Sequence, residues 1–327
     1  MVSYYDKLDK NSRGQIRNGF GSGLVEAGKS NKEIVALCAD LTGSVKVDEF
    51  AEKYPKRFFE MGISEQNMLS AAAGMTIRNK IPFAVSYAAF NPGRNWDQLR
   101  VSVCYQNANV KIIGGHAGLT TGPDGATHQA LEDIAITRVL PNLTVIVPAD
   151  EEETKKATLA ISEHKGPCYL RLTREKSLNI TNEKSEFIIG KGNILDNGSD
   201  VTIIACGITV QMALEARSIL EKEKIKATVV NMHTIKPLDT KLIEKLSKKT
   251  GCFVTVEEHQ KAGGLGSAVA EFLSQNNPTP IEIIGTNDTF GESGPGYGLL
   301  TKYKISTNEI IKRVKKVIER KNQIKKK

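Results

Sequence analysis

The alternation of short apolar runs with longer helical stretches constrains the fold of this chain more than any other feature. Runs of strand length occur at 34–39, 82–87, 110–114, 143–147 and 168–172, and helical patterns occur at 65–78, 94–105, 129–139 and 150–164. Each interval is long enough for the crossover connection that parallel strands require. The order therefore predicts a mainly parallel sheet with helices on both faces, the last helix being capped at its start by Asp150.

A second alternation follows a polar stretch at 176–199, which contains Asn-Gly and Gly-Lys-Gly sequences. Strand-length runs lie at 201–206, 227–231, 253–256 and 281–284, and helical patterns lie at 210–222, at 240–248, after Gly263-Gly-Leu-Gly266 and from Asn308 onward. A chain of 327 residues also exceeds one typical core. We therefore expect an α/β fold of two doubly wound, mainly parallel-sheet domains, at 1–178 and 199–327, joined by a linker at 179–198.

Composition argues against several classes of protein. The chain is 40% hydrophobic and 25% charged, as in ordinary soluble domains, and it lacks an apolar run near the roughly 18 residues of a membrane span. Its first residues contain no apolar signal core, so we expect a cytoplasmic protein. Five widely spaced cysteines indicate reduced, buried thiols, with a reactive thiol as the alternative: Cys38, Cys104, Cys168, Cys206 and Cys252.

The net charge of +8 raises the question of a nucleic-acid partner. The lysines are scattered, however, and the basic cluster at 320–327 ends a terminal helix, where cations meet the helix dipole favourably. Little aromatic interleaving and no recognised nucleic-acid motif accompany these charges. We expect neither nucleic acid nor membrane as a partner, and a positive field that attracts phosphorylated substrates.

Glu65 is the first candidate functional residue, in the sequence Met61-Gly-Ile-Ser-Glu-Gln-Asn-Met68. A carboxylate in the first turn of a helix is favourable for the helix dipole alone, so a structural role is the simpler interpretation of this residue by itself. Tyr87 and Phe90 follow in and just after the next strand, at the edge where parallel sheets bind ligands. A carboxylate beside an aromatic platform suits a flat nitrogen heterocycle.

The second candidate is the loop that runs from His116 to His128 and contains Asp124. A loop this long and rich in Gly and Thr buries little, so its polar side chains are expected to face a ligand. Two histidines that flank one loop with an aspartate between them indicate chemistry more strongly than a single histidine does. The spacing is too wide and the residue types too mixed for a zinc site, so we expect no metal ligands here.

Four residues could reach one anion, because they follow strands whose ends meet at one rim of a parallel sheet or lie close to that rim. They are Arg17, Ser44, His116 and Arg174. Arginine and hydroxyl groups gathered at such a rim suit a phosphate. Spacing alone makes this a weak signal, since surface arginines are common.

Several motifs together resemble the C-terminal half of transketolase. They are ADLTGS (39–44), MGISEQNM (61–68), GHAGLTTGPDGATHQ (115–129), LPN (140–142), VPAD (147–150), LRLTR (170–174), IKPLD (235–239) and VEEHQKAGGLGS (256–267). The resemblance runs through nearly the whole chain from Arg17 onward. It is greatest to the separate C-terminal subunit of transketolases that are split into two chains.

The resemblance implies a cofactor, thiamine diphosphate, and roles for individual residues. Glu65 would bind the aminopyrimidine of the cofactor and act in its acid–base activation, and Ile63 would hold the cofactor in its bent conformation. Phe90, Tyr87 and Asp40 would complete the cofactor site.

The resemblance likewise implies a sugar site. Arg17, Ser44, His116 and Arg174 would bind the sugar phosphate, Asp124 would hold a sugar hydroxyl, and His128, with His116, would lie beside the reacting oxygens. The implied reaction is ketol transfer, in which a two-carbon unit passes from a ketose phosphate to an aldose phosphate.

Two departures from the family pattern bear on this expectation. Ala117 follows His116 where single-chain transketolases usually have an aspartate, and the diphosphate-binding motif that begins with GDG and ends in Asn is absent. The resemblance therefore implies a separate N-terminal partner subunit that holds the diphosphate and Mg²⁺, together with self-association in an α2β2-type heterotetramer. The alternatives are a deoxyxylulose-phosphate-synthase-like subunit, a 2-oxoacid dehydrogenase β-type subunit, and a non-catalytic partner chain.

Overall fold

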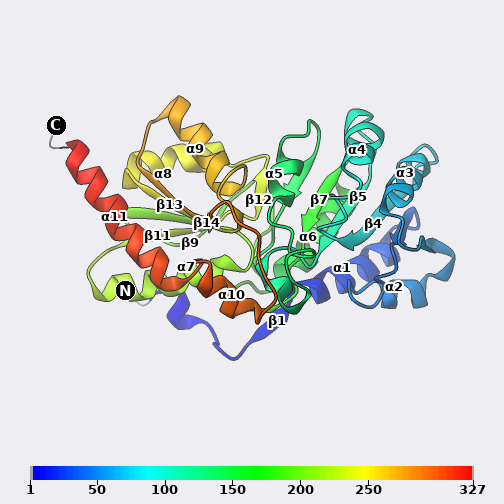
Figure 1. Cartoon of the computed structure of the whole chain (residues 1–327), viewed down its shortest axis with the longest axis horizontal. Helices are drawn as coiled ribbons and strands as arrows, with labels where there is room; N and C mark the ends of the chain where they lie inside the picture. Colours follow the sequence, from blue (N-terminus) through cyan, green and yellow to red (C-terminus); the bar gives the residue numbers. More distant parts are fainter. Residues whose placement is uncertain (1–2, 326–327) are drawn as a thin grey trace.

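The computed structural model describes residues 3–325, which form two α/β halves side by side (Figure 1). Seven strands make the first sheet, in the order β12-β6-β7-β5-β4-β2-β3. Their bounds are β2 Ile34–Cys38, β3 Phe58–Glu60, β4 Ile81–Tyr87, β5 Lys111–Gly115, β6 Thr144–Ile146, β7 Cys168–Arg171 and β12 Thr234–Lys236. All neighbours in this sheet are parallel except β12 and β6.

Five strands make the second sheet, in the order β14-β13-β10-β11-β9. Their bounds are β9 Asn193–Asp196, β10 Val201–Ala205, β11 Ala227–Asn231, β13 Phe253–Gln260 and β14 Ile281–Thr286. Only β9 runs antiparallel to its neighbour β11. The expected α/β architecture with two mainly parallel sheets is therefore confirmed.

Helices cover the two sheets and short segments connect them. The longer helices are α1 Ile16–Ser30, α2 Asp48–Lys53, α3 Glu65–Thr76, α5 Asp133–Arg138, α6 Glu151–Glu163, α7 Thr209–Lys222, α8 Thr240–Thr250, α9 Leu265–Asn276, α10 Gly296–Lys302 and α11 Thr307–Lys325. The short elements are η1 Tyr5–Lys7, β1 Arg13–Gln15, η2 Pro55–Arg57, α4 Trp96–Gln98, the π-helix η3 Leu99–Tyr105, the 3₁₀ segment η4 Leu119–Asp124, and β8 Lys176–Leu178, which pairs with β1.

Most expected elements lie within a few residues of their expected positions, and three differences are informative. The helix expected at 94–105 is a short α-helix that continues as a π-helix. The helix expected at 129–139 begins only at Asp133, because Ala130 pairs with Ala117 in an isolated parallel bridge. The polar stretch 176–199 contains two strands, β8 and β9, and β9 belongs to the second sheet.

Two local expectations are confirmed. Asp150 caps α6, since its Oδ1 accepts a hydrogen bond of 2.8 Å from the backbone N–H of Glu153. All five cysteines are buried. Burial raises the pKa of the Cys38 thiol to about 11 and that of Cys104 to about 12, so neither is a thiolate nucleophile near neutral pH.

Within residues 3–325, every helix falls short of the length and apolar character that a membrane crossing requires.

Backbone pairing and buried polar contacts join the two halves. Strand β12 comes from the second half of the chain but extends the first sheet by pairing with β6. Asn231, at the end of β11, donates a hydrogen bond of 2.7 Å to Glu153 in α6. His259 of β13 accepts a hydrogen bond of 3.2 Å from the backbone N–H of Ala135 in α5. These contacts fix the second half against the carboxyl edge of the first sheet.

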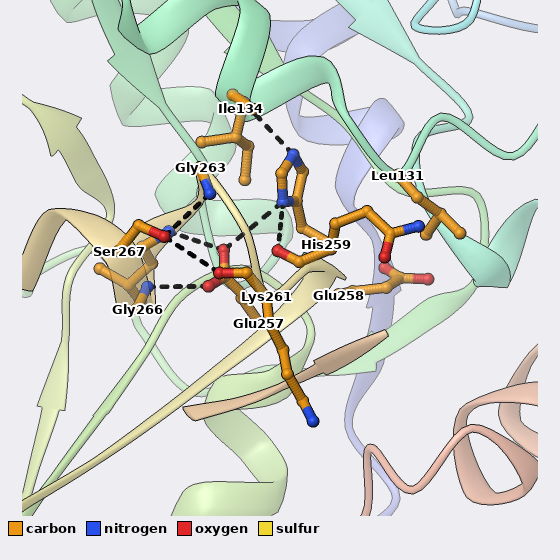
Figure 2. Close-up of polar contacts among 12 residues, drawn as sticks. Leu131, Ile134, Glu257, Glu258, His259, Lys261, Gly263, Gly266 and Ser267 are labelled. Atoms are coloured by element: carbon orange, nitrogen blue, oxygen red, sulfur yellow. Dashed lines mark hydrogen bonds and ion pairs between the residues drawn. The ribbon is translucent and has the colours of Figure 1, made fainter. Parts of the chain in front are cut away.

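A buried ion-pair network lies at the same junction. The guanidinium of Arg171, at the end of β7, donates to Asp133 at 2.8 Å and to the backbone carbonyl of Glu258 at 2.8 Å. The Glu258 carboxylate lies 3.9 Å from the same guanidinium, and Tyr169 donates a hydrogen bond of 2.7 Å to Asp133. Figure 2 shows Glu258 beside His259, close to Leu131 of the first half.

We predict that the stability of the fold depends on pH through Glu153. Burial and, second, the charge of Asp150 raise the pKa of Glu153 to about 8. Because this folded pKa exceeds that of an unfolded glutamate, its contribution to stability is complete below the unfolded pKa and is lost as pH rises through about 8. Urea unfolding between pH 5 and 8 should show this fall. Glu153→Gln should reduce the fall by more than about 1.4 kcal/mol, the equivalent of one pKa unit.

The matched control is Glu152→Gln, which changes the neighbouring, partly exposed side chain of the same helix. Its stability curve should run parallel to that of the wild type. A Glu153→Gln curve that also runs parallel to the wild type would contradict the prediction.

Candidate functional site

The candidate site lies where the neighbouring strands β4 and β5 end. Tyr87, the last residue of β4, is in register with Gly115, the last residue of β5, so His116 follows directly beside Tyr87. The two rings stack with their centroids 4.0 Å apart and an angle of 27° between their planes. Parallel register thus brings together two side chains that are 29 positions apart in the sequence.

The loop after His116 returns His128 to the same place. The ring of His128 packs edge-on against Tyr87, at 6.2 Å between centroids, and against Phe90, at 5.3 Å. The hydroxyl of Thr127 lies 2.8 Å from Nδ1 of His128. Four of the sequence-predicted residues therefore form one cluster of aromatic and imidazole rings: Tyr87, Phe90, His116 and His128.

Glu65 is the first residue of α3 and is almost completely buried, with an exposed fraction of 1%. Ser86 donates a hydrogen bond of 3.2 Å to Oε1, and Arg94 forms an ion pair of 2.7 Å with Oε2. The planar guanidinium of Arg94 also lies over the ring of Phe90, 4.4 Å from its centroid. The sequence interpretation missed Arg94, although its position four residues after Phe90 could have suggested that the two side chains meet.

Two further arginines contact the loop between His116 and His128 or the residues beside it. Arg17 donates to the carbonyl of Ser44 at 3.0 Å and lies 3.3 Å from Nε2 of His116. Arg174 donates to the carbonyl of Thr121 at 2.8 Å and forms an ion pair of 3.2 Å with Asp124. The structure thus places all four predicted anion-binding residues, together with Asp124, around one loop.

The electrostatics of this region favour an anion. Burial, assisted by the charges of Arg17 and Arg174, lowers the pKa of His116 to about 3, so its ring is neutral near pH 7 and Nε2 can accept a hydrogen bond from Arg17. Burial and the charge of Arg174 also lower the pKa of Arg17. Both effects result in part from the positive charge of the two arginines, which Asp124 and, at Arg17, Glu175 offset in part and which a bound oxyanion would offset further.

His116 has an unusual backbone conformation, with φ at +52°. A left-handed conformation costs a residue with a Cβ free energy, so the surroundings must enforce it. Two hydrogen bonds hold this conformation. The backbone N–H of Ala117 donates to the carbonyl of Leu172 at 3.0 Å, and the hydroxyl of Thr121 donates to the carbonyl of His116. In this conformation the His116 ring contacts Tyr87 and Arg17.

Asp40 and Ile63 lie apart from this cluster, at the ends of β2 and β3. Asp40 is exposed with φ at +57°, and Ile63 is 73% exposed. Glu60, which the sequence interpretation did not single out, accepts hydrogen bonds from the backbone of Asp40 at 2.8 Å and of Gly62 at 3.1 Å. Among residues 3–325, none of the hydrogen bonds, ion pairs or ring contacts joins Asp40 or Ile63 to the ring cluster.

The described residues do not supply a metal centre. Over residues 3–325, no group of three or more His, Cys, Asp or Glu side chains is arranged to hold a metal ion.

The chain matches two consecutive domain families. Residues 13–178 match the transketolase pyrimidine binding domain, and residues 190–310 match the transketolase C-terminal domain. A putative transketolase C-terminal section from Methanocaldococcus jannaschii is 45% identical over 302 residues, which are 91% of this chain and 95% of that protein. A 6-deoxy-6-sulfo-D-fructose transketolase subunit from Clostridium sp. is 40% identical over 307 residues, 94% of this chain and 95% of that protein.

Comparison with solved structures agrees with these matches. A structure described as a split gene transketolase, inactive beta4 tetramer, superposes with a TM-score of 0.88 at 45% identity, and the match covers 93% of this chain and 98% of that one. The resemblance drawn from the sequence motifs is thereby confirmed. This chain belongs to the transketolase family and is similar over nearly its full length to separate C-terminal subunits of that family.

Proposed function

We propose that this chain is the C-terminal subunit of a two-chain, thiamine-diphosphate-dependent transketolase. It would move a two-carbon ketol unit from a ketose phosphate to an aldose phosphate. One observation carries the proposal: a buried carboxylate, Glu65, faces a planar cation that is stacked on Phe90, and this pair adjoins a loop with several anion-binding groups.

The residues present fit the aminopyrimidine half of the cofactor. The Arg94 guanidinium is flat, donates N–H groups and lies between Glu65 and Phe90, so this space already accepts a group with the shape and donor pattern of a protonated ring. Arg94 would move aside when the cofactor binds, and Glu65 would then hold a proton against the ring nitrogen. Bound thiamine diphosphate would supply the carbanion chemistry that C–C bond cleavage requires. Tyr87, Ile63 and Asp40 would line the remainder of this half-site.

The sugar would bind between Arg17, Ser44, His116 and Arg174. Two arginines and a neutral histidine suit the terminal oxyanion of a sugar, either a phosphate or the sulfonate on which the Clostridium relative is named to act. Asp124 and His128 would bind the hydroxyl and carbonyl oxygens near the reacting carbons. The neutral imidazole of His116 can accept or donate a hydrogen bond there.

The partner follows from what the described half-site lacks. No GDG…N motif is present in the sequence, and residues 3–325 contain no cluster of metal-binding side chains. We infer that a separate N-terminal subunit contributes the diphosphate and Mg²⁺ site and that this chain self-associates in an α2β2-type assembly. The similar structure described as a split gene transketolase, inactive beta4 tetramer, supports the split into two chains and the self-association. We further propose domains at 1–178 and 199–327 with a linker at 179–198. The family matches at 13–178 and 190–310 support two domains with the first ending near residue 178. We also propose a cytoplasmic location, which the buried cysteines support.

We predict no ketol transfer by this chain alone and turnover after addition of the partner subunit, thiamine diphosphate and Mg²⁺. A donor and acceptor screen of the complex measures this: xylulose 5-phosphate with ribose 5-phosphate against pyruvate with glyceraldehyde 3-phosphate, and each with a sulfonated analogue. Robust turnover by the isolated chain would refute the two-chain proposal, and use of pyruvate as donor would refute ketol transfer.

We expect Glu65→Gln to lower kcat of the reconstituted enzyme by at least about a hundredfold, because the amide cannot hold the proton against the cofactor ring. Circular dichroism should show an unchanged fold. The control is Glu49→Gln, an exposed carboxylate in α2. Near-wild-type turnover of the Glu65 variant would sink the assignment of this residue.

Arg174→Met should raise KM for a phosphorylated acceptor by at least about tenfold, because it removes a cation from the oxyanion site. KM for the matching unphosphorylated aldose should change little. Arg174→Lys keeps the charge but not the fork of donors, so it should recover part of the loss. Equal changes for both acceptors would show that Arg174 has a structural role only.

A further inference from the structure

The loop that contains Asp124 and His128 is held by the second half of the chain as well as by its own contacts. Gln129, at the end of the loop and 4% exposed, donates through Nε2 to the carbonyls of Gly122 at 3.2 Å, Leu119 at 3.3 Å and Glu292 at 2.9 Å. One buried amide thus ties the η4 segment to the connection between β14 and α10.

Glu258 of β13 makes a second tie. Its carboxylate accepts a hydrogen bond of 2.5 Å from the backbone N–H of Thr120, which lies inside η4. The guanidinium of Arg171 binds the backbone carbonyl of Glu258 and lies near its carboxylate, so the acceptor is fixed from the opposite side. Figure 2 shows this carboxylate projecting from the chain beside Leu131.

The two halves approach so closely at Gly118 and Gly291 that neither position has room for a side chain. A Cβ at Gly118 would lie 2.3 Å from the Glu258 carboxyl carbon, and the φ of +84° there also favours glycine. A Cβ at Gly291 would lie 1.9 Å from Oε1 of Gln129. Helix α10 packs against η4 on the remaining side. The position of the loop is therefore set by surfaces from the second half.

We propose that Gln129 and Glu258 are positioning residues through which the second half of the chain shapes the sugar-binding loop. Their ties bracket Asp124, which lies between Thr120 and Gln129, and His128 immediately precedes Gln129. Loss of either tie would shift Asp124 and His128 relative to His116. Glu65 lies on α3, which packs mainly against β4, β2 and the neighbouring π-helix, so the cofactor half-site should keep its geometry.

Hydrogen–deuterium exchange of the full-length chain tests the ties without any ligand. Gln129→Met keeps the volume and removes the three hydrogen bonds, and the amides of 118–129 should exchange at least about tenfold faster. Glu258→Leu should do the same at Thr120, while Glu258→Gln retains an oxygen acceptor and should restore most of the protection. If Glu258→Leu does not fold, Gly291→Ala, which displaces the Gln129 amide, provides the second variant.

The matched control is Asn231→Leu, which removes another buried amide that bridges the halves, at Glu153 in α6. It should leave exchange of 118–129 within about twofold of the wild type. Unchanged exchange of the loop in Gln129→Met, or an equal increase in Gln129→Met and Asn231→Leu, would overturn the inference.

The functional consequence rests on the proposed ketol transfer and is measured separately. In the reconstituted complex, Gln129→Met should raise KM for ribose 5-phosphate and lower kcat, while the affinity for thiamine diphosphate, measured by calorimetry, stays the same. A wild-type complex without ketol transfer would contradict the proposed function and leave the exchange result intact. Loosened exchange with unaltered sugar kinetics would refute the positioning role.

Discussion

The buried charge of Arg171 is the constraint on which the junction of the two halves depends. A guanidinium with 2% exposure is stable only when buried acceptors offset the loss of hydration, and here the acceptors come from both halves: Asp133 from α5 and Glu258 from β13. Neither half alone could satisfy this cation. The network therefore favours one relative placement of the halves over others that would bury the same apolar area.

The relative placement of the two halves determines part of the geometry of the site. The carboxyl edge of the first sheet supplies Tyr87 and His116 through strand register, which is a property of the sheet alone. The path of the loop between His116 and His128 is different in kind, because its buried N–H and carbonyl groups are satisfied partly by Glu258 and Gln129 at the junction. Ring stacking and loop shape thus have separate physical origins within one site.

The sequence was sufficient to predict most of the helices and strands, but it did not show which of them pack together. Apolar runs predicted nine of the twelve strands that the structure describes in the two sheets, since buried parallel strands read as continuous apolar segments, but the short strands β3, β9 and β12 were not predicted. The three-residue strand β12 carries no such signal, and its pairing with β6 depends on how the halves dock. In the same way, motifs identified Glu65, His116 and Arg174, but the pairing of Glu65 with Arg94, 29 residues away, appears only once α3 and the segment after β4 are packed together.

The two ends of the site differ in charge, and this difference affects which ligand can bind. At the Glu65 end, Arg94 neutralises the carboxylate, so a cationic ring, or a ring that shares a proton with Glu65, can replace the guanidinium without leaving a buried charge alone. At the Arg17 end, burial and the charges of Arg17 and Arg174 lower the pKa of His116 to about 3, so this imidazole stays neutral beside the two arginines. A ligand that presents a flat nitrogen heterocycle at one end and meets an oxyanion at the other would satisfy both ends at once. In the proposed function, this asymmetry of charge would order cofactor and sugar along the edge of the first sheet.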